Sequence, residues 1–285
     1  MKKTRLHIGT AGWSYEDWKG IVYPEPRPRG FEELSFLSTL FNAVEVNSTF
    51  YRPTSAKMAE GWVKKTEWRG EFSFTAKLWQ RFTHELSTPY SPNEVKLFRS
   101  GLAPLIEAGK LGGLLVQFPW SFRDSPAARE HLARVADDFS DVRLFLEVRH
   151  ASWLTEDSSD LFRKLRLNFV NIDQPRSSSS IPPTDLVTGK AAYFRFHGRN
   201  AAKWFDKNAS RDERYDYLYS KKELTPWAQK IRRLIGEVEL IYTITNNHFR
   251  GQAAANALQL QKLLTGSSSP SPPSLVATFP FLQEG

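Results

Sequence analysis

The chain has 285 residues, of which 40% are hydrophobic and 25% are charged, and its formal net charge is +8 with a pI near 9.6. This size and composition suit one compact domain as large as an enzyme, and no run approaches the roughly 18 apolar residues of a membrane span. The absence of cysteine excludes a disulfide framework and a thiolate metal site. The basic start lacks the apolar stretch of a secretion signal, so we expect a cytoplasmic protein.

Short apolar segments that end in polar residues recur along the chain. In order, they are Leu6 to Ser14, Ala43 to Tyr51, Phe72 to Trp79, Leu114 to Pro119, Leu144 to His150, Phe169 to Asp173, Ala191 to Arg199 and Leu240 to Asn247. Stretches with helical periodicity separate most of them, at about 31–42, 55–66, 91–109, 126–139, 153–167 and 252–264. Strands that alternate with helices indicate βαβ units, and eight such units predict a single-domain α/β fold, a TIM-like (β/α)8 barrel.

Local signals refine this prediction. Residues 91–94 read Ser-Pro-Asn-Glu, a capping box with proline at the first helical position. Ser125-Pro126 and Thr225-Pro226 predict two further helix starts of the same kind. Residues 174–190, between the sixth and seventh strands, are rich in serine and proline, so we expect an irregular connection without a full helix.

The domain organisation follows from composition. Residues 1–265 are expected to form the barrel, and residues 266–285 a Ser/Pro linker with an apolar segment that docks on it. Residues 198–221 mix aromatic and charged side chains and are a candidate lid over the barrel mouth.

Active sites of TIM barrels lie at the carboxyl ends of the strands, where the polar endings of these segments should meet. Residues two apart on a strand share one face. The pairs expected to face the mouth are Glu45 with Asn47, Thr75 with Lys77, Leu115 with Gln117, Glu147 with Arg149, Asn171 with Asp173, Arg195 with His197, and Ile244 with Asn246.

Several motifs together resemble the DUF72 family, also called the YecE-like family. They are GTAGWSYEDWKG at 9–20, VEVNSTFYR at 44–52, FSFTAKL at 72–78, QFP at 117–119, EVRHASW at 147–153, FRFHGR at 194–199, RYDYLYSKKEL at 214–224 and NNHFRGQAAANA at 246–257. The resemblance covers nearly the whole chain and implies a TIM-like barrel, but it brings no established activity. The likeness of this barrel to endonuclease IV and sugar isomerases is one of fold only.

Candidate roles follow from side-chain chemistry. The candidate catalytic residues are Glu45, Glu147, Lys77, His197 and Asp173. The candidate substrate-binding residues are Asn47, Tyr51, His84, Gln117, Arg149, Trp153, Arg195, Arg199, Tyr215, Tyr217, Asn246 and Asn247. Lys77 could form a Schiff base if burial lowered its pKa, or could clamp an anion. The two glutamates could instead neutralise the basic side chains in a buried ion network.

A metal-free enzyme fits these residues best. Arginine and lysine would bind a phosphorylated or other anionic small molecule, while a glutamate and a histidine transfer protons. A retaining glycosidase of the large barrel clan is disfavoured, because its two carboxylates are missing from the ends of strands four and seven, which carry Gln117 and Arg195 to His197.

Two other classes remain open. No cofactor is predicted, but a divalent metal is possible in an endonuclease-IV-like enzyme, with Glu45, Glu147, Asp173 and His197 as an oxygen-rich set for Mg or Mn. The other class is a noncatalytic module that binds a ligand or nucleic acid. Nucleic acid is the less favoured partner, because the basic residues are dispersed and no groove-reading element is evident.

Overall fold

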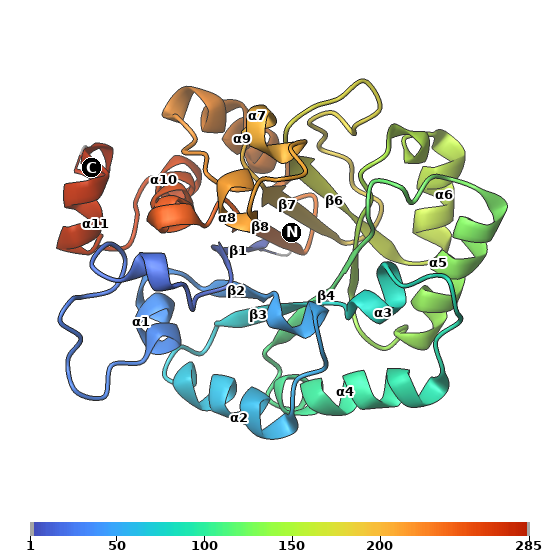
Figure 1. Ribbon diagram of the computed structural model, residues 1–285, viewed down its shortest axis with the longest axis horizontal. Helices are drawn as coiled ribbons and strands as arrows, with labels where there is room; N and C mark the ends of the chain where they lie inside the picture. The colour runs from blue at the N-terminus through green and yellow to red at the C-terminus, as the bar shows by residue number, and fades with distance from the viewer. Residues whose placement is uncertain (1–2, 284–285) are drawn as a thin grey trace.

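Eight parallel strands close into a barrel in chain order, as the computed structural model shows for residues 3–283 (Figure 1). The strands are β1 (Arg5–Ala11), β2 (Ala43–Val46), β3 (Ser73–Lys77), β4 (Leu111–Gln117), β5 (Leu144–Glu147), β6 (Leu167–Asp173), β7 (Ala191–Phe196) and β8 (Leu240–Thr245). Pairing of β1 with β8 completes the closure. The predicted TIM-like barrel is confirmed. Residues 1–2 and 284–285, the outer ends of the expected barrel and C-terminal segment, lie outside the described residues.

Helices surround the barrel (Figure 1). They are α1 (Glu33–Leu40), α2 (Ala56–Lys65), α3 (Gln80–Thr83), α4 (Pro92–Glu107), α5 (Pro126–Asp138), α6 (Glu156–Lys164), α7 (Ala201–Trp204), α8 (Arg211–Arg214), α9 (Lys221–Leu234), α10 (Gln252–Thr265) and α11 (Pro273–Thr278). Short 3-10 turns are η1 (Glu16–Trp18), η2 (Ser48–Phe50), η3 (Ala151–Trp153), η4 (Phe249–Gly251) and η5 (Pro280–Leu282). Several of these turns directly follow strands and shape the mouth of the barrel.

Two of the three predicted helix starts are confirmed. Ser91 accepts a hydrogen bond from the Glu94 amide, and the Glu94 carboxylate accepts one from the Ser91 amide, which completes the capping box of α4. The Ser125 hydroxyl caps α5 by accepting a hydrogen bond from the Ala128 amide, with Pro126 at the first helical position. The third prediction is wrong, because α9 already begins at Lys221 and Pro226 lies inside it. A capping box at Ser220 satisfies the first amides of α9, so Pro226 removes only one intrahelical hydrogen bond.

The connection from β6 to β7 has no helix, as predicted. The side chain of Asn171 holds it to the outside of the barrel. Its Oδ1 accepts hydrogen bonds from the Leu186 amide at 2.8 Å and from the Thr184 hydroxyl at 2.7 Å. Hydrogen bonds thus attach this loop to the barrel. In the connections that contain a helix, the apolar face of the helix packs on the barrel instead.

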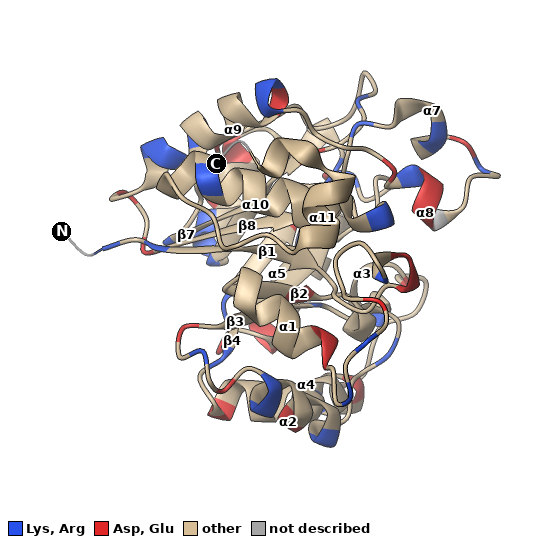
Figure 2. Cartoon of the chain, turned by 90° about the vertical axis from the view of Figure 1, so that its left-hand side faces the viewer, with Lys and Arg blue, Asp and Glu red and all other residues tan. Residues whose placement is uncertain are grey.

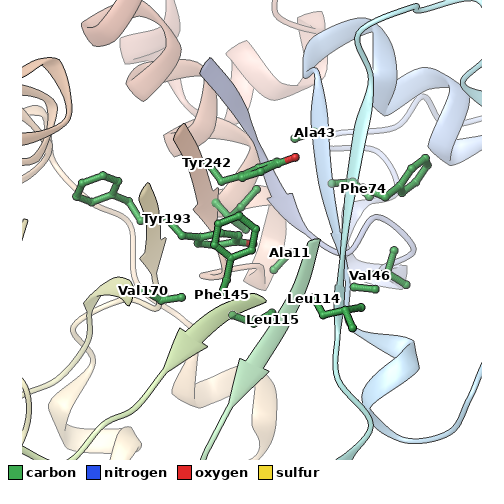
Figure 3. Close-up of a cluster of buried hydrophobic side chains, with 14 of the residues drawn as sticks. Ala11, Ala43, Val46, Phe74, Leu114, Leu115, Phe145, Val170, Tyr193 and Tyr242 are labelled. Atoms are coloured by element: carbon green, nitrogen blue, oxygen red, sulfur yellow. The ribbon is translucent and has the colours of Figure 1, made fainter. Parts of the chain in front are cut away.

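Aromatic side chains fill the middle of the barrel (Figure 3). The rings of Phe145 and Tyr193 lie 4.8 Å apart, and those of Tyr193 and Tyr242 lie 5.5 Å apart. The Tyr193 hydroxyl lies 3.0 Å from the Thr75 hydroxyl, so its polar end is also satisfied. This packed layer closes the barrel from below, which leaves room for a ligand at the carboxyl ends.

Strand β6 turns Asn171 and Asp173 away from the barrel interior, while Asn168 shares the inner face with Val170 and Ile172. Val170 pairs with Tyr193 and Ile172 with Arg195. Since paired residues of neighbouring strands point to the same face, the two apolar residues point inward. The prediction that Asn171 and Asp173 face the mouth is therefore wrong. Asn171 instead bonds to the loop between β6 and β7, and Asp173 bonds to helix α9.

The carboxyl ends of the strands lie opposite the N-terminus, where α7 and α8 project (Figure 2). Lys and Arg are interspersed with Asp and Glu over the face seen in this view. At the C-terminus, Leu275 is buried, and the Ser274 hydroxyl donates to the Ile21 carbonyl at 2.8 Å. No helix in the described part of the chain has the length and apolar character needed to cross a membrane.

Candidate functional site

A cavity of about 350 Å³ opens at the carboxyl ends of the strands. Its lining comes from the carboxyl ends of seven of the strands, all except β6, and from the segments that follow them. The lining residues are Gly12, Trp13, Ser14, Tyr15, Asn47, Ser48, Phe50, Tyr51, Lys77, Gln117, Arg149, Arg195, Tyr215, Asn246 and His248.

Arg195 forms the centre of the cavity floor, and only 2% of it is exposed. Its Nη2 lies 2.6 Å from Oε1 of Glu45, and its Nη1 lies 2.9 Å from Oε2 of Glu147. The Tyr193 hydroxyl donates to Oε2 of Glu45 at 2.7 Å. Buried charges are tolerated when they are paired and hydrogen-bonded, and this network meets both conditions.

Glu147 joins the floor to the cavity wall. Its Oε1 accepts hydrogen bonds from Nε and Nη2 of Arg149, at 3.0 Å and 2.9 Å. Burial alone would raise the pKa of this carboxyl, but Arg195, His197 and Arg149 outweigh burial and hold the pKa well below its usual value. Glu147 is therefore a carboxylate at neutral pH with both oxygens already bonded, which suits it to holding cations in place.

His197 is enclosed beside this carboxylate. Its Nε2 lies 3.3 Å from Oε1 of Glu147, and its Nδ1 lies 3.0 Å from Nδ2 of Asn246. Burial is the largest effect and lowers the pKa of His197 to about 3, so the ring is neutral at pH 7. With Asn246 donating to Nδ1, the proton sits on Nε2 and points to Glu147.

Lys77 differs from the arginines because its charge has no counterion. Its Nζ lies 3.7 Å from the centre of the Phe50 ring, and no carboxylate of the described residues lies within ion-pair distance. Burial, helped by the positive charge of Arg195, lowers the pKa of Lys77 to about 7. The unprotonated amine of Lys77 is thus accessible near neutral pH. The ring of Phe50 accommodates both forms, since it attracts the ammonium and packs against the amine.

The rim of the cavity offers unsatisfied polar groups. Oδ1 of Asn47 is buried and has no hydrogen-bond partner among the side chains and backbone that the structure describes. The amides of Trp13 and Ser14 follow the turn at Gly12, where φ is 85°, and within the described chain they bond to no acceptor. Buried polar groups are usually paired in folded proteins, so Oδ1 of Asn47 is available to a ligand, and the less buried amides of Trp13 and Ser14 lie beside it at the rim.

Aromatic side chains form one side of the mouth. The ring of Tyr15 stacks on His248 with 4.6 Å between centroids, and Tyr215 lies 5.3 Å from the same histidine. Tyr215 belongs to the segment 198–221, which therefore contributes to the cavity wall.

Asp173 and Arg199 lie in a separate network on the outside of the barrel. Nε and Nη2 of Arg199 donate to the two oxygens of Asp173 at 2.8 Å and 2.6 Å. Tyr219 also donates to Asp173, at 3.0 Å, and Trp227 of α9 donates to its other oxygen. Asp173 is thus surrounded by donors that fasten α9, and neither residue lines the cavity.

Four further residues predicted to bind substrate also fall outside the cavity lining. Trp153 is buried and donates from Nε1 to the Phe122 carbonyl at 2.8 Å. Tyr217 donates to Glu223, and Asn247 donates to the Tyr217 carbonyl at 2.8 Å. His84 packs its ring against Phe50, with 4.8 Å between centroids, behind the wall of the cavity.

The structure does bring most of the predicted residues together. Those that line the cavity are Asn47, Tyr51, Lys77, Gln117, Arg149, Arg195, Tyr215 and Asn246. Glu45 and Glu147 bond to Arg195, and His197 lies against Glu147. Sequence analysis did not select Ser48 or His248. Their position just after β2 and β8 is the signal that could have found them.

The residues suggested from the sequence as ligands of a divalent metal do not form a single metal site. Among the residues described, no group of three or more His, Cys, Asp or Glu side chains is placed to hold a metal ion. Glu45 and Glu147 bind Arg195 between them, and Asp173 points to the other side of the sheet. These donors do not fit the Mg or Mn set considered from the sequence.

Comparisons with known proteins agree with the sequence motifs. A family model described as "Protein of unknown function DUF72" matches residues 7–276. The chain is 29% identical over 276 residues to the UPF0759 protein YunF of Bacillus subtilis (strain 168), which covers 91% of this chain and 94% of that protein. A DUF72 family protein of Thermotoga maritima has a similar structure, with TM-score 0.81, 36% identity, and coverage of 91% of this chain and 99% of that one. One from Enterococcus faecalis gives TM-score 0.80 and 26% identity, over 94% and 98% of the two chains.

Proposed function

The chain belongs to the DUF72 family, and we propose that it is an enzyme that uses acid/base chemistry on a phosphorylated or other anionic small molecule. The observation that carries the proposal is Lys77, an amine at the cavity without a counterion and with a pKa lowered to about 7 by burial. General acid/base catalysis is most efficient when the pKa of the group lies near the working pH.

Charge supports an anionic ligand. The cations at the cavity are Lys77, Arg149 and Arg195, and the carboxylates bonded to them are Glu45 and Glu147. With Lys77 protonated, one positive charge therefore remains unpaired. A phosphate or carboxylate of the ligand would supply the missing charge in a site partly shielded from water, where charge-assisted hydrogen bonds are strong.

The assignment of roles changes from that expected from the sequence alone. Glu147 stays ionised at neutral pH, and His197 stays neutral and enclosed. Both groups position Arg195 and Arg149, while Lys77 is the group that can gain or lose a proton near pH 7. An anion bound beside Lys77 would raise the pKa of Lys77. The share of Lys77 that remains an amine is the base that takes a C–H proton from the ligand, and the ammonium formed exchanges that proton with solvent and returns one to the same carbon.

Binding is tested by calorimetry with phosphorylated compounds, such as glucose 6-phosphate, and their uncharged parents. We expect binding of the phosphorylated compounds, weakened at least about tenfold in Lys77→Met and in Arg149→Met, a loss typical of a charge-assisted contact. Lys57 is exposed on α2, and Lys57→Met is the matched control. Equal binding of the uncharged parents would contradict the proposal.

Proton transfer is tested separately, by incubating phosphorylated aldoses and ketoses in D2O and following exchange of their C–H protons by NMR. Wild type should introduce deuterium into a bound compound next to its carbonyl group. Lys77→Met should not, even at concentrations that saturate it. Exchange at the wild-type rate in Lys77→Met would remove Lys77 from the mechanism.

A further inference from the structure

A second cavity, of about 470 Å³, lies beside the first and shares one residue with it. The shared residue is Arg149, whose guanidinium is held by Glu147. The other lining residues are Trp120, Gln174, Ser177, Ser179, Ser180, Trp204 and Phe205, from the segments that follow β4, β6 and β7. We call this second cavity the side pocket.

Aromatic side chains of the side pocket are unusually open to solvent. Trp120 is 42% exposed and Phe205 is 56% exposed. Trp204 lies between the two cavities, with its ring 5.6 Å from Cζ of Arg149. Exposed aromatic rings grouped in a cavity indicate a binding surface, because they offer apolar area at a low cost in side-chain entropy.

Gln174 adds a polar group that lacks a partner within the protein. Only 6% of this residue is exposed, and its Oε1 is buried without a hydrogen bond to any described residue. The folded chain thus buries an amide at the wall of the side pocket and leaves it unsatisfied. A ligand with N–H or O–H groups would satisfy it.

The serine wall of the side pocket is held in a defined shape. The Ser180 hydroxyl accepts a hydrogen bond from the Ser177 amide at 3.0 Å. The Ala151 amide donates to the Ser179 carbonyl at 2.8 Å, and the Ile181 amide donates to the Arg149 carbonyl at 3.1 Å. These bonds attach the turn to the end of β5, so Gln174 and Arg149 face the pocket from a built framework.

We propose that the side pocket binds the ring of the substrate while Arg149 contacts its anionic group in the central cavity. This inference rests on the proposed function and narrows it to phosphorylated compounds that carry a ring with hydrogen-bond donors. Sugar rings and nucleobases share this chemistry, since each has an apolar face for Trp120 and donors for Gln174.

Calorimetry with inorganic phosphate, glucose 6-phosphate and AMP tests the proposal at one ionic strength. At least one of the two ring compounds should bind about tenfold more tightly than inorganic phosphate. The two arms distinguish a sugar from a nucleobase. Gln174→Met and Trp120→Ala should remove that gain and leave phosphate binding within about twofold of wild type. Trp68 is exposed in the turn before β3, at the other end of the barrel, and Trp68→Ala is the control.

A thermal melt separates binding from folding in these variants. Gln174→Met breaks no hydrogen bond of the free protein, so it should melt no lower than wild type. The side-pocket proposal would be wrong if the ring compounds bound no more tightly than phosphate. It would also be wrong if their tighter binding persisted in both Gln174→Met and Trp120→Ala. Either result would leave the proposed function intact. A failure of phosphate itself to bind in an Arg149-dependent way would overturn both.

Discussion

At the scale of single residues, one buried arginine organises the candidate site. Arg195 needs two carboxylates because a lone guanidinium could not be buried at the end of the barrel. Those carboxylates are consequently unavailable as free acids or bases. The remaining cation, Lys77, is buried without such a partner, and its pKa falls for that reason.

Glu147→Gln tests whether that carboxylate is needed for the fold. The substitution leaves Arg195 and Arg149 without one of their negative partners, so we expect a loss of about 3–5 kcal/mol in the free energy of unfolding. Urea unfolding measures it, with exposed Glu60→Gln as the control. A stability equal to that of wild type would show that the network does not depend on this charge.

At the scale of elements, the barrel was predictable and the orientation of β6 was not. Alternation of short apolar segments with helical periodicity indicates parallel strands, and most strands show which face is polar. Residues 167–173 read LNFVNID and are buried on both faces, so polarity does not reveal the inward side. Pairing with β7 decides it, and that is tertiary information. For the same reason, Asp173 looked like a site residue although it fastens α9.

The start of α9 gives a prediction at this scale. Ser220→Ala removes the side chain that caps the helix and should cost about 1 kcal/mol. Thr225→Ala lies inside the helix, where the hydroxyl donates only to the Lys221 carbonyl, and should cost much less. Both substitutions remove a hydroxyl group and leave alanine, and Thr225→Ala removes a methyl group as well. Urea denaturation midpoints of the two variants compare the two positions. A larger cost at Thr225 would place the helix start where the sequence first indicated it.

At the scale of the whole molecule, buried histidines make stability depend on pH. Burial is the largest effect at both His7 and His197, and it lowers their pKa values to about 4 and about 3. Below about pH 6.5 these two histidines are therefore protonated in the unfolded chain but remain neutral in the folded chain. Their contribution to stability is complete above pH 6.5 and is lost as the pH falls towards these folded values.

Between pH 6.5 and 5, each of these histidines should remove roughly 1.5 kcal/mol from the free energy of unfolding. Denaturant titrations at several pH values measure the slope. His7→Phe keeps a ring to stack on Tyr242, and it should reduce the slope without changing the cavity. Equal stability at pH 7 and pH 5 would show that these histidines accept protons in the folded state.

The central claim is that Lys77 titrates near neutral pH at the cavity. Its ammonium form has no counterion in the protein and would pair with an anionic ligand. Reductive methylation with 13C-formaldehyde labels the lysines, and Lys77→Met identifies the Lys77 signal in an NMR titration. The account predicts a pKa of about 7 for Lys77 and a higher value when phosphate is added. A pKa near the ordinary 10.4, unchanged by phosphate, would contradict it.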